Sequence, residues 1–205
     1  MGTHLVISGN IGSGKSTLLN ILRERLNKKE YTFIDEPVDI WKSITDKDGI
    51  NTLQHYYNDP QKNAFNLQML ALITRIEKMK KANEQDGKIF IGERCLYEDR
   101  EIFAKLSVDD GFITSIEYQT YKYYFDAFKI KEPTKIFYIN TQPQECLNRI
   151  QKRGRPEEAD ISLEYLRKLH LYYAEWLCGG DIPVVFLDGK LSSEELADRI
   201  INHLS

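Results

Sequence analysis

Residues 9–16 of the chain read GNIGSGKS, and this stretch decides the fold. It satisfies the pattern G-x-x-x-x-G-K-[ST], with a buried-strand pattern before it at 4–8 and a helical pattern after it at 17–22. Glycines allow backbone N–H groups to turn inward around a polyphosphate, and the start of a helix adds a partial positive charge. The stretch therefore predicts a phosphate-binding loop rather than a glycine-rich turn that merely caps a helix.

Two side chains at the end of this loop carry specific chemistry. Lys15 is placed to reach the β- and γ-phosphates of a nucleoside triphosphate, and the Ser16 hydroxyl is a ligand for Mg²⁺. We therefore expect ATP and Mg²⁺ to bind here. The expected donor site consists of Gly9, Asn10, Ile11, Gly12, Ser13, Gly14, Lys15, Ser16 and Thr17.

Composition narrows the class of protein. A length of 205 residues with 41% hydrophobic content favours one compact domain over 1–205. A net charge of −3 shows no excess of positive charge of the kind that binds nucleic acid or an anionic membrane. A phosphate ligand must therefore be held by local cations.

The cysteines and the apolar segments bear on location. Cys95, Cys146 and Cys178 are far apart and show no metal-binding spacing, so we expect free thiols in a reducing compartment. No apolar leader region and no segment of membrane-span length are found in the sequence. We therefore expect a cytoplasmic protein.

Strand-like and helix-like segments alternate along the chain. This alternation predicts an α/β protein of the three-layer P-loop type, with a five-stranded parallel sheet flanked by helices. Ligands of such sheets bind at the carboxyl ends of the strands, so functional residues should follow strands. The expected strands are 5–8, 31–35, 89–92, 135–139 and 184–187, and the expected helices are 15–28, 63–83, 96–106, 114–128, 143–153, 163–177 and 194–204.

Acidic and basic side chains follow the second and third strands. Glu36 is placed to accept a proton from a hydroxyl that attacks the γ-phosphate, although an ordinary loop carboxylate would look the same. Glu93 is placed to hold Mg²⁺ or its water, and Arg94 to pair with Glu36 and stabilise charge on a transferring phosphoryl group. The alternative is a surface salt bridge at the end of a strand. Trp41 fits a core position equally well.

Three arginines cluster around Gly154. Arg149 and Arg153 share a helix face at i,i+4 spacing, and Arg155 follows the glycine. Three guanidinium groups around a glycine hinge are typical of a lid, here at about 149–160, that closes over a triphosphate. Compensation of a helix dipole explains one of these arginines but not all three.

The expected helix 63–83 carries Gln68, Ala71 and Arg75 on one face. A glutamine is a bidentate partner for the edge of a base, and Arg75 adds donors, which indicates a nucleobase pocket; a solvated polar face is the alternative. The aromatic run 118–128 is more typical of a core or an oligomer interface than of a ligand site.

Taken together, these motifs resemble those of the deoxynucleoside kinase family. The resemblance covers nearly the whole chain and rests on the phosphate loop, 36–38 with Trp41, the run LQHYYNDP at 53–60, Gln68, 93–94, RGRPEE at 153–158 and LEYL at 163–166. Cys95 is a departure, since the family usually has Ser there. The chain after 188–190 is also shorter than in the animal deoxycytidine enzymes, so the adenine-binding loop is expected to differ.

The resemblance implies an ATP- and Mg²⁺-dependent kinase, mostly homodimeric as a family, that phosphorylates the 5′-hydroxyl of a deoxynucleoside. It implies that Glu36 is the base for this hydroxyl and that Arg94 lies beside it. It further implies that Tyr57 and Glu158 hold the 3′-hydroxyl, while Gln68 reads the base. The implied catalytic residues are Glu36, Arg94, Lys15, Arg153 and Arg155; the lid arginines at the ATP site are Arg149, Arg153 and Arg155; the nucleoside site is Glu36, Trp41, Leu53, Tyr57, Leu67, Gln68, Ala71, Arg75, Arg94, Asp99, Phe103 and Glu158; and the metal ligands are Ser16 and Glu93.

Arg75 and Asp99 bear on the choice of base. In the resemblance, these positions hold Arg and Asp in deoxycytidine and deoxyguanosine kinases, whereas thymidine-preferring members have a Met-and-Ala type pair that leaves space for the thymine methyl group. We therefore expect deoxycytidine and the purine deoxynucleosides to be preferred over thymidine. A structural salt bridge without ligand contact is the alternative.

Two competing functions stay open at this point. A nucleoside monophosphate kinase of the thymidylate kinase type would need cations for the acceptor phosphate, where this chain offers Glu36 and Trp41. A nucleotide-gated P-loop switch would not need Gln68, Tyr57 and Glu158 arranged for a second small ligand.

Overall fold

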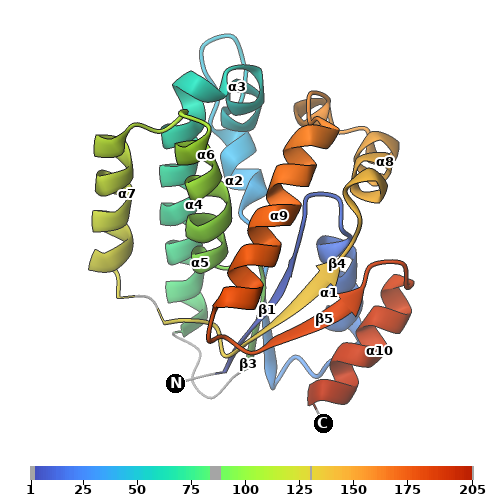
Figure 1. Ribbon diagram of the computed structural model, residues 1–205. Coiled ribbons are helices and arrows are strands. Elements are labelled where there is room, and N and C mark those ends of the chain that lie inside the picture. Colours follow the sequence, from blue (N-terminus) through green and yellow to red (C-terminus); the bar gives the residue numbers. More distant parts are fainter. Residues whose placement is uncertain (1–2, 84–88, 130, 205) are drawn as a thin grey trace.

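The computed structural model describes residues 3–83, 89–129 and 131–204, and it is built around one five-stranded sheet (Figure 1). All strand pairs are parallel, and the strand order is β2-β3-β1-β4-β5. The predicted parallel sheet is thus confirmed. The strands are β1 (His4–Gly9), β2 (Tyr31–Ile34), β3 (Ile89–Glu93), β4 (Lys135–Asn140) and β5 (Val184–Asp188).

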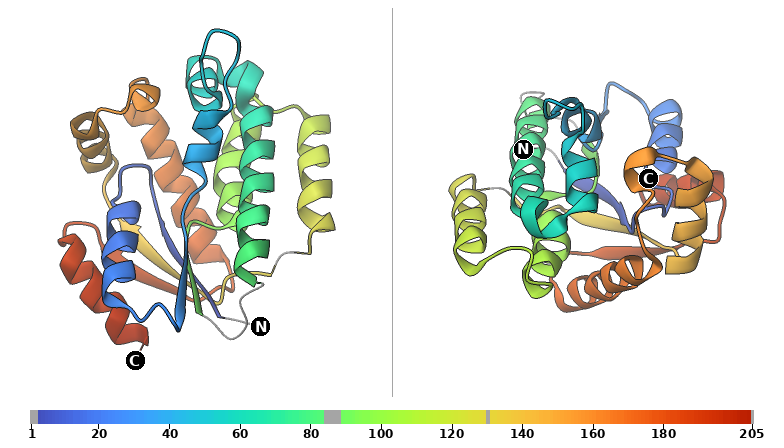
Figure 2. Two further views of the ribbon diagram at one scale, coloured as in Figure 1. Left: turned by 180° about the vertical axis from the view of Figure 1, so that it is seen from behind. Right: turned by 90° about the horizontal axis from the view of Figure 1, so that it is seen from above.

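Helices cover both faces of the sheet, because apolar side chains of each strand point alternately to either side. On one face, buried residues of β1, β3, β4 and β5 pack against α1 and α10; on the other face, buried residues of β1 and β4 pack against α8, α9 and the segment after β3 (Figures 1 and 2). The helices are α1 (Lys15–Arg25), α2 (Val38–Ser43), α3 (Thr52–Asn58), α4 (Pro60–Asn83), α5 (Leu96–Glu98), the π-helix η1 (Asp99–Ala104), α6 (Lys105–Asp109), α7 (Ser115–Ala127), α8 (Pro143–Arg153), the 3₁₀ turn η2 (Pro156–Glu158), α9 (Leu163–Gly179) and α10 (Ser193–Leu204).

The helical segments depart from the sequence prediction at five elements. The helices α2 and α3 were not predicted, because each is shorter than two full turns and shows no apolar period. The predicted helix 96–106 is interrupted by the π-helix η1. The predicted helix 15–28 ends at Arg25, and the predicted helix 63–83 begins earlier, at Pro60, where proline is well tolerated in a first turn.

The phosphate loop is held close against α8. Gly12 has φ +77°, and a Cβ atom there would lie 2.5 Å from the carbonyl oxygen of Cys146 and 2.9 Å from Cγ1 of Ile150. Both contacts are too short for any side chain, so the glycine is required by space as well as by backbone conformation.

The cysteines are free, as predicted: Cys95 and Cys146 are buried and Cys178 is exposed. Within the described ranges, no helix is both long and apolar enough to cross a membrane.

Candidate active site

A cleft of about 230 Å³ opens at the carboxyl ends of β1, β2 and β3. One end is formed by the phosphate loop and the segment 153–158, and the other by α2, α3, α4 and η1. The cleft brings together most of the predicted site residues, namely Ile11, Gly12, Gly14, Lys15, Ser16, Thr17, Glu36, Trp41, Leu53, Tyr57, Leu67, Gln68, Ala71, Glu93, Arg94, Asp99, Phe103, Arg153, Arg155 and Glu158.

Five predicted site residues do not line this cleft. Gly9, Asn10 and Ser13 belong to the phosphate loop but do not line the cleft. Arg75 contacts the cleft residue Glu36, and Arg149 contacts the phosphate loop at Ser13. Conversely, four residues that line the cleft were not predicted from the sequence. These are Val38, Tyr56, Glu157 and Tyr165.

Lys15 lies inside the phosphate loop. Its Nζ donates a hydrogen bond to the carbonyl oxygen of Asn10 at 2.8 Å. Burial lowers the pKa of Lys15 to about 8, and the nearby positive charge of Arg94 acts in the same direction. An anionic phosphate in this loop would favour the charged form of the lysine, so the free loop is electrostatically suited to an anion.

Ser16 and Glu93 meet where the phosphate loop enters α1. The Ser16 Oγ donates a hydrogen bond to Oε1 of Glu93 at 2.9 Å. Hydroxyl and carboxylate oxygens are hard ligands of the kind that Mg²⁺ prefers, and Mg²⁺ usually takes only one or two protein ligands beside phosphates and water. In the part of the chain that the structure describes, no group of three or more His, Cys, Asp or Glu residues could hold a metal ion. The residues present therefore fit a phosphate-bound Mg²⁺ rather than a metal held entirely by protein.

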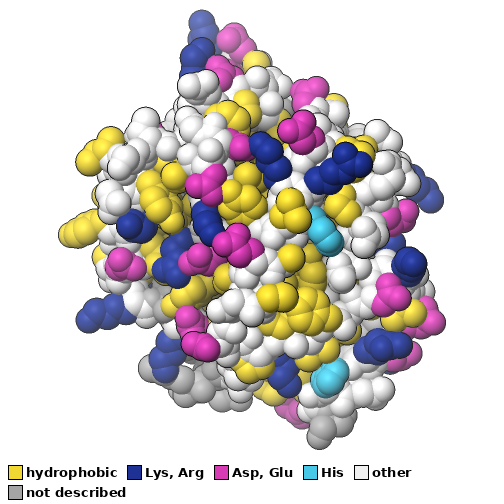
Figure 3. Space-filling model, viewed as in Figure 1, with side chains coloured by type: hydrophobic (Ala, Val, Ile, Leu, Met, Phe, Trp, Pro, Cys, Tyr) yellow, Lys and Arg dark blue, Asp and Glu magenta, His cyan; other side chains and the backbone are white. Residues whose placement is uncertain are grey.

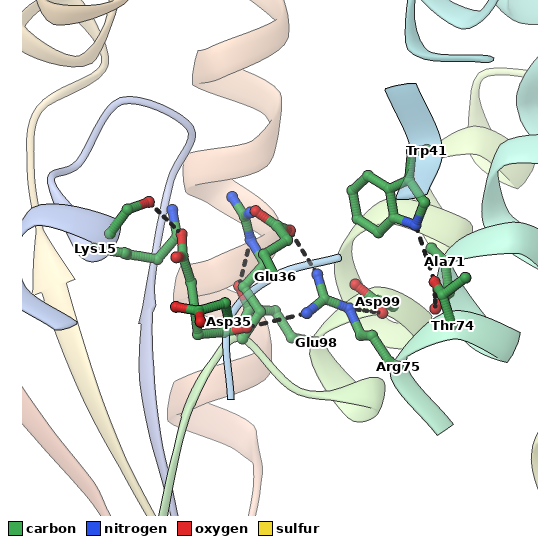
Figure 4. Close-up of polar contacts among 12 residues, drawn as sticks. Lys15, Asp35, Glu36, Trp41, Ala71, Thr74, Arg75, Glu98 and Asp99 are labelled. Atoms are coloured by element: carbon green, nitrogen blue, oxygen red, sulfur yellow. Dashed lines mark hydrogen bonds and ion pairs between the residues drawn. The ribbon is translucent and has the colours of Figure 1, made fainter. Parts of the chain in front are cut away.

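Glu36 is held by two arginines. The Nη1 of Arg94 donates to both carboxylate oxygens, at 2.7 and 2.8 Å. The Nη2 of Arg75 donates to Oε1 at 2.5 Å (Figure 4). The predicted pairing of Glu36 with Arg94 is confirmed. Burial raises the pKa of Glu36, but Arg94, Arg75 and Lys15 together outweigh it and lower this pKa to about 2. The group is therefore a carboxylate at neutral pH.

Arg94 has an unusual backbone conformation. Its φ is +62°, in the left-handed region that non-glycine residues rarely adopt. The backbone N–H donates to the carbonyl oxygen of Ile7 at 3.1 Å, and the guanidinium lies over the ring of Phe103, 5.0 Å from its centroid. Residues in such sparsely populated conformations cluster at functional sites, where the surrounding structure holds them.

The far end of the cleft is apolar with a few polar groups. Trp41 is both a cleft residue and a core residue, because its ring is buried and its Nε1 donates to Oγ1 of Thr74 at 2.9 Å. Gln68 and Ala71 come from α4 and are also buried. The π-helix η1 places both Asp99 and Phe103 at the cleft. This combination suits a flat aromatic ligand with polar edges.

Arg75 and Asp99 form the predicted ion pair. The Nε of Arg75 lies 2.5 Å from Oδ2 of Asp99, and both side chains are almost completely buried (6% and 4% exposed). Asp99 lines the cleft, whereas Arg75 lies behind it and also donates to the carbonyl oxygen of Glu93 at 3.0 Å. Burial raises the pKa of Asp99 to about 7.

The three arginines predicted to form a lid have different partners. Arg153 donates to Oε2 of Glu158 at 2.5 Å, and Arg155 donates to Oε1 of the same carboxylate at 3.4 Å. Gly154 lies between them with φ +66° and ends α8. Arg149 instead donates to the carbonyl oxygens of Ser13 and Gly189, both at 3.0 Å, so it braces the phosphate loop.

These features define the class of protein. A phosphate loop at the end of the first strand of a parallel sheet, with a buried carboxylate and an arginine beside a second ligand pocket, is the site of a P-loop kinase that acts on a small molecule.

The comparisons with known proteins then identify the family. The chain belongs to the deoxynucleoside kinase family, whose model matches residues 5–205. The chain is 32% identical to deoxycytidine kinase 2 of Gallus gallus, with 97% of this chain and 89% of that protein covered. It is 31% identical to the deoxyadenosine/deoxycytidine kinase of Bacillus subtilis (strain 168), with 96% and 90% covered.

A solved structure is similar in fold as well. Deoxyadenosine kinase from M. mycoides, with the products dCMP and a flexible dCDP bound, superposes with a TM-score of 0.83. The two chains are 27% identical, and 98% of each is covered. The protein described here is accordingly an ATP-dependent phosphotransferase of deoxynucleosides.

Proposed function

We propose that this kinase transfers the γ-phosphoryl group of ATP to the 5′-hydroxyl of a deoxynucleoside, with Glu36 as the general base. The observation that carries the proposal is the position of the Glu36 carboxylate. It lies in the cleft between the phosphate loop and the apolar pocket, and it is held as an anion by Arg94 and Arg75.

The low pKa of Glu36 makes it a weak proton acceptor. A carboxylate with a pKa of about 2 has little drive to remove a proton from a free alcohol. In a loose phosphoryl-transfer transition state, however, the hydroxyl becomes acidic as its oxygen bonds to phosphorus. Glu36 would therefore orient the hydroxyl first and accept its proton late in the step.

The other site residues supply position and charge. Lys15 and the backbone of the phosphate loop would bind the donor phosphates, while Arg153 and Arg155 would neutralise charge on the transferring group. Ser16 and Glu93 would hold Mg²⁺, which when bound neutralises phosphate charge. Glu158, together with Tyr57, would hold the 3′-hydroxyl. The segment 149–160 would act as the lid.

We further propose that deoxycytidine and the purine deoxynucleosides are preferred over thymidine. The Arg75–Asp99 pair fills the wall of the pocket next to Ala71 and leaves a carboxylate facing the cleft. Hydrogen-bonding partners of this kind suit an exocyclic amine better than a methyl group. The names of the B. subtilis and M. mycoides relatives agree with this preference.

A homodimer in the cytoplasm is part of the same proposal. On α7, Ile116 and Tyr123 are 74% and 73% exposed, and hydrophobic side chains gather on this edge of the molecule in Figure 3. An exposed apolar face is typical of a protein interface. The free cysteines agree with a reducing compartment.

The decisive experiment is turnover of Glu36→Gln measured with ATP over a panel of nucleosides and monophosphates. We expect the variant to fold and to bind ATP, but to lose roughly 10²–10⁴-fold in turnover, as is usual for a lost general base. Retention of more than about half of the wild-type turnover would exclude Glu36 as the base. Activity on monophosphates alone would favour the thymidylate kinase type of function instead.

A further inference from the structure

A buried carboxylate behind the cleft has no role in the mechanism above. Glu98, at the end of α5, is fully buried and does not line the cleft. Its Oε1 lies 3.0 Å from Nε of Arg94 and accepts a hydrogen bond from the hydroxyl of Tyr173 at 2.5 Å. Burying a carboxylate is unfavourable unless it is well partnered, so this arrangement requires an explanation.

The contact with Arg94 bears directly on Glu36. The guanidinium of arginine is planar and rigid, so a partner that fixes its Nε also fixes the direction of its Nη1. In Arg94, Nη1 is the atom that donates to both oxygens of Glu36. Arg94 also has a left-handed backbone conformation, with φ +62°, and its side chain contacts Glu98 through Nε and Glu36 through Nη1.

Tyr173 links this pair to the phosphate loop. It comes from α9, the helix that follows the lid, and its hydroxyl also lies 3.1 Å from the carbonyl oxygen of Gly9. Gly9 ends β1 at the point where the phosphate loop begins. One hydroxyl thus touches both Glu98 on the acceptor side and the backbone on the donor side of the site.

We infer that Glu98 and Tyr173 are positioning residues, which fix the Arg94 guanidinium so that it holds Glu36 in register with the phosphate loop. The inference rests on the proposed role of Glu36. Positioning of a catalytic group contributes to the barrier of the chemical step, so its loss should lower kcat more than it raises the nucleoside KM.

The test is kinetics of Tyr173→Phe, which keeps the ring and removes the hydroxyl. We expect kcat to fall roughly tenfold, the order for one lost hydrogen bond to a charged group, with the nucleoside KM within about twofold of wild type. Tyr138→Phe is the matched control, because this ring packs on Tyr173 with 5.3 Å between centroids and lies outside the Arg94 contacts described above. We expect it to keep the wild-type kcat.

A second variant and a double-mutant cycle separate positioning from simple packing. Glu98→Gln keeps the shape of the side chain and removes its charge, and we expect a similar fall in kcat. If Tyr173 acts through Glu36, then Tyr173→Phe should have little further effect in a Glu36→Gln background. A purely structural role would lower the melting temperature and leave kcat of the folded enzyme unchanged.

Each outcome has one meaning. Wild-type kcat in both folded Tyr173→Phe and Glu98→Gln, with Glu36→Gln inactive, overturns this inference and leaves the proposed function intact. The inference is also overturned if Tyr173→Phe lowers kcat by the same factor in the wild-type and in the Glu36→Gln background. Wild-type turnover of Glu36→Gln refutes the proposed base instead. If Tyr173→Phe fails to fold, the cycle is carried out with Glu98→Gln.

Discussion

Replacing the Arg75–Asp99 pair tests the proposed base preference most directly. The substitution Arg75→Met with Asp99→Ala removes both charges and opens space at the wall of the pocket. We expect the ratio of thymidine to deoxycytidine kcat/KM to rise roughly 10- to 100-fold, the range over which a methyl-sized fit discriminates. Arg94 still holds Glu36 through two bonds, so turnover on the better substrate should stay within about tenfold of wild type.

The stability of the same variants follows from the buried geometry. Asp99→Ala alone leaves Arg75 buried without its partner at 2.5 Å, which costs 3–5 kcal/mol for a typical buried pair. Arg75 keeps Glu36 and the Glu93 carbonyl as partners, so we expect the lower end, about 3 kcal/mol. The double variant leaves no unpaired charge and should recover most of this loss.

The assays are competition kinetics with deoxycytidine, deoxyadenosine, deoxyguanosine and thymidine, and urea unfolding of each variant. Lys78→Met is a matched control, since Lys78 lies one turn after Arg75 on α4 and donates to the backbone of Asp35 outside the cleft. It should leave the base preference unchanged. A wild-type enzyme that prefers thymidine, or a double variant without a shift toward it, would refute the reasoning.

Three further predictions concern the donor side. Lys15→Ala should abolish transfer while calorimetry still detects nucleoside binding, because we expect Lys15 to contact the donor phosphates and not the nucleoside; loss of nucleoside binding in the folded variant would contradict the two-site arrangement. Arg153→Ala and Arg155→Ala should each lower kcat with a modest change in nucleoside KM, and a pure rise in KM would place them on the acceptor side. The Kd for ATP should rise above pH 8, since Lys15, whose pKa is about 8 in the free protein, must then take up a proton to bind phosphate; a Kd that is flat from pH 7 to 9.5 would contradict this.

The fold and the strand–loop–helix setting of the phosphate loop are predictable from the sequence because their signals are local. The phosphate loop is contiguous, and its strand–loop–helix context lies within 4–22. Glu36 and Arg94 are 58 residues apart, yet their pairing was predictable because both follow strands that end at the same edge of the sheet. A contact between residues far apart in the sequence can thus be predicted when both follow strands of one parallel sheet, because their carboxyl ends lie at the same edge.

Other parts of the site leave no local signal. Glu98 and Tyr173 are 75 residues apart, on helices whose relative rotation depends on packing, so their contact cannot be read from spacing. The π-helix η1 adds a residue to a turn, which changes the face that Asp99 and Phe103 present. Arg75 was expected in the pocket because it shares a face with Gln68, but its long side chain reaches back to three other partners.

The contact of Gly12 with α8 has a consequence for protein engineering. The atom that a new side chain at 12 would strike is a backbone oxygen, so no change of rotamer can relieve the clash. Only a displacement of the whole helix makes room, and that helix carries Arg149, which is bonded to the same loop at Ser13. The position of α8 and the residue at 12 are therefore coupled. Attempts to redesign the phosphate-donor preference through the loop have to vary both together.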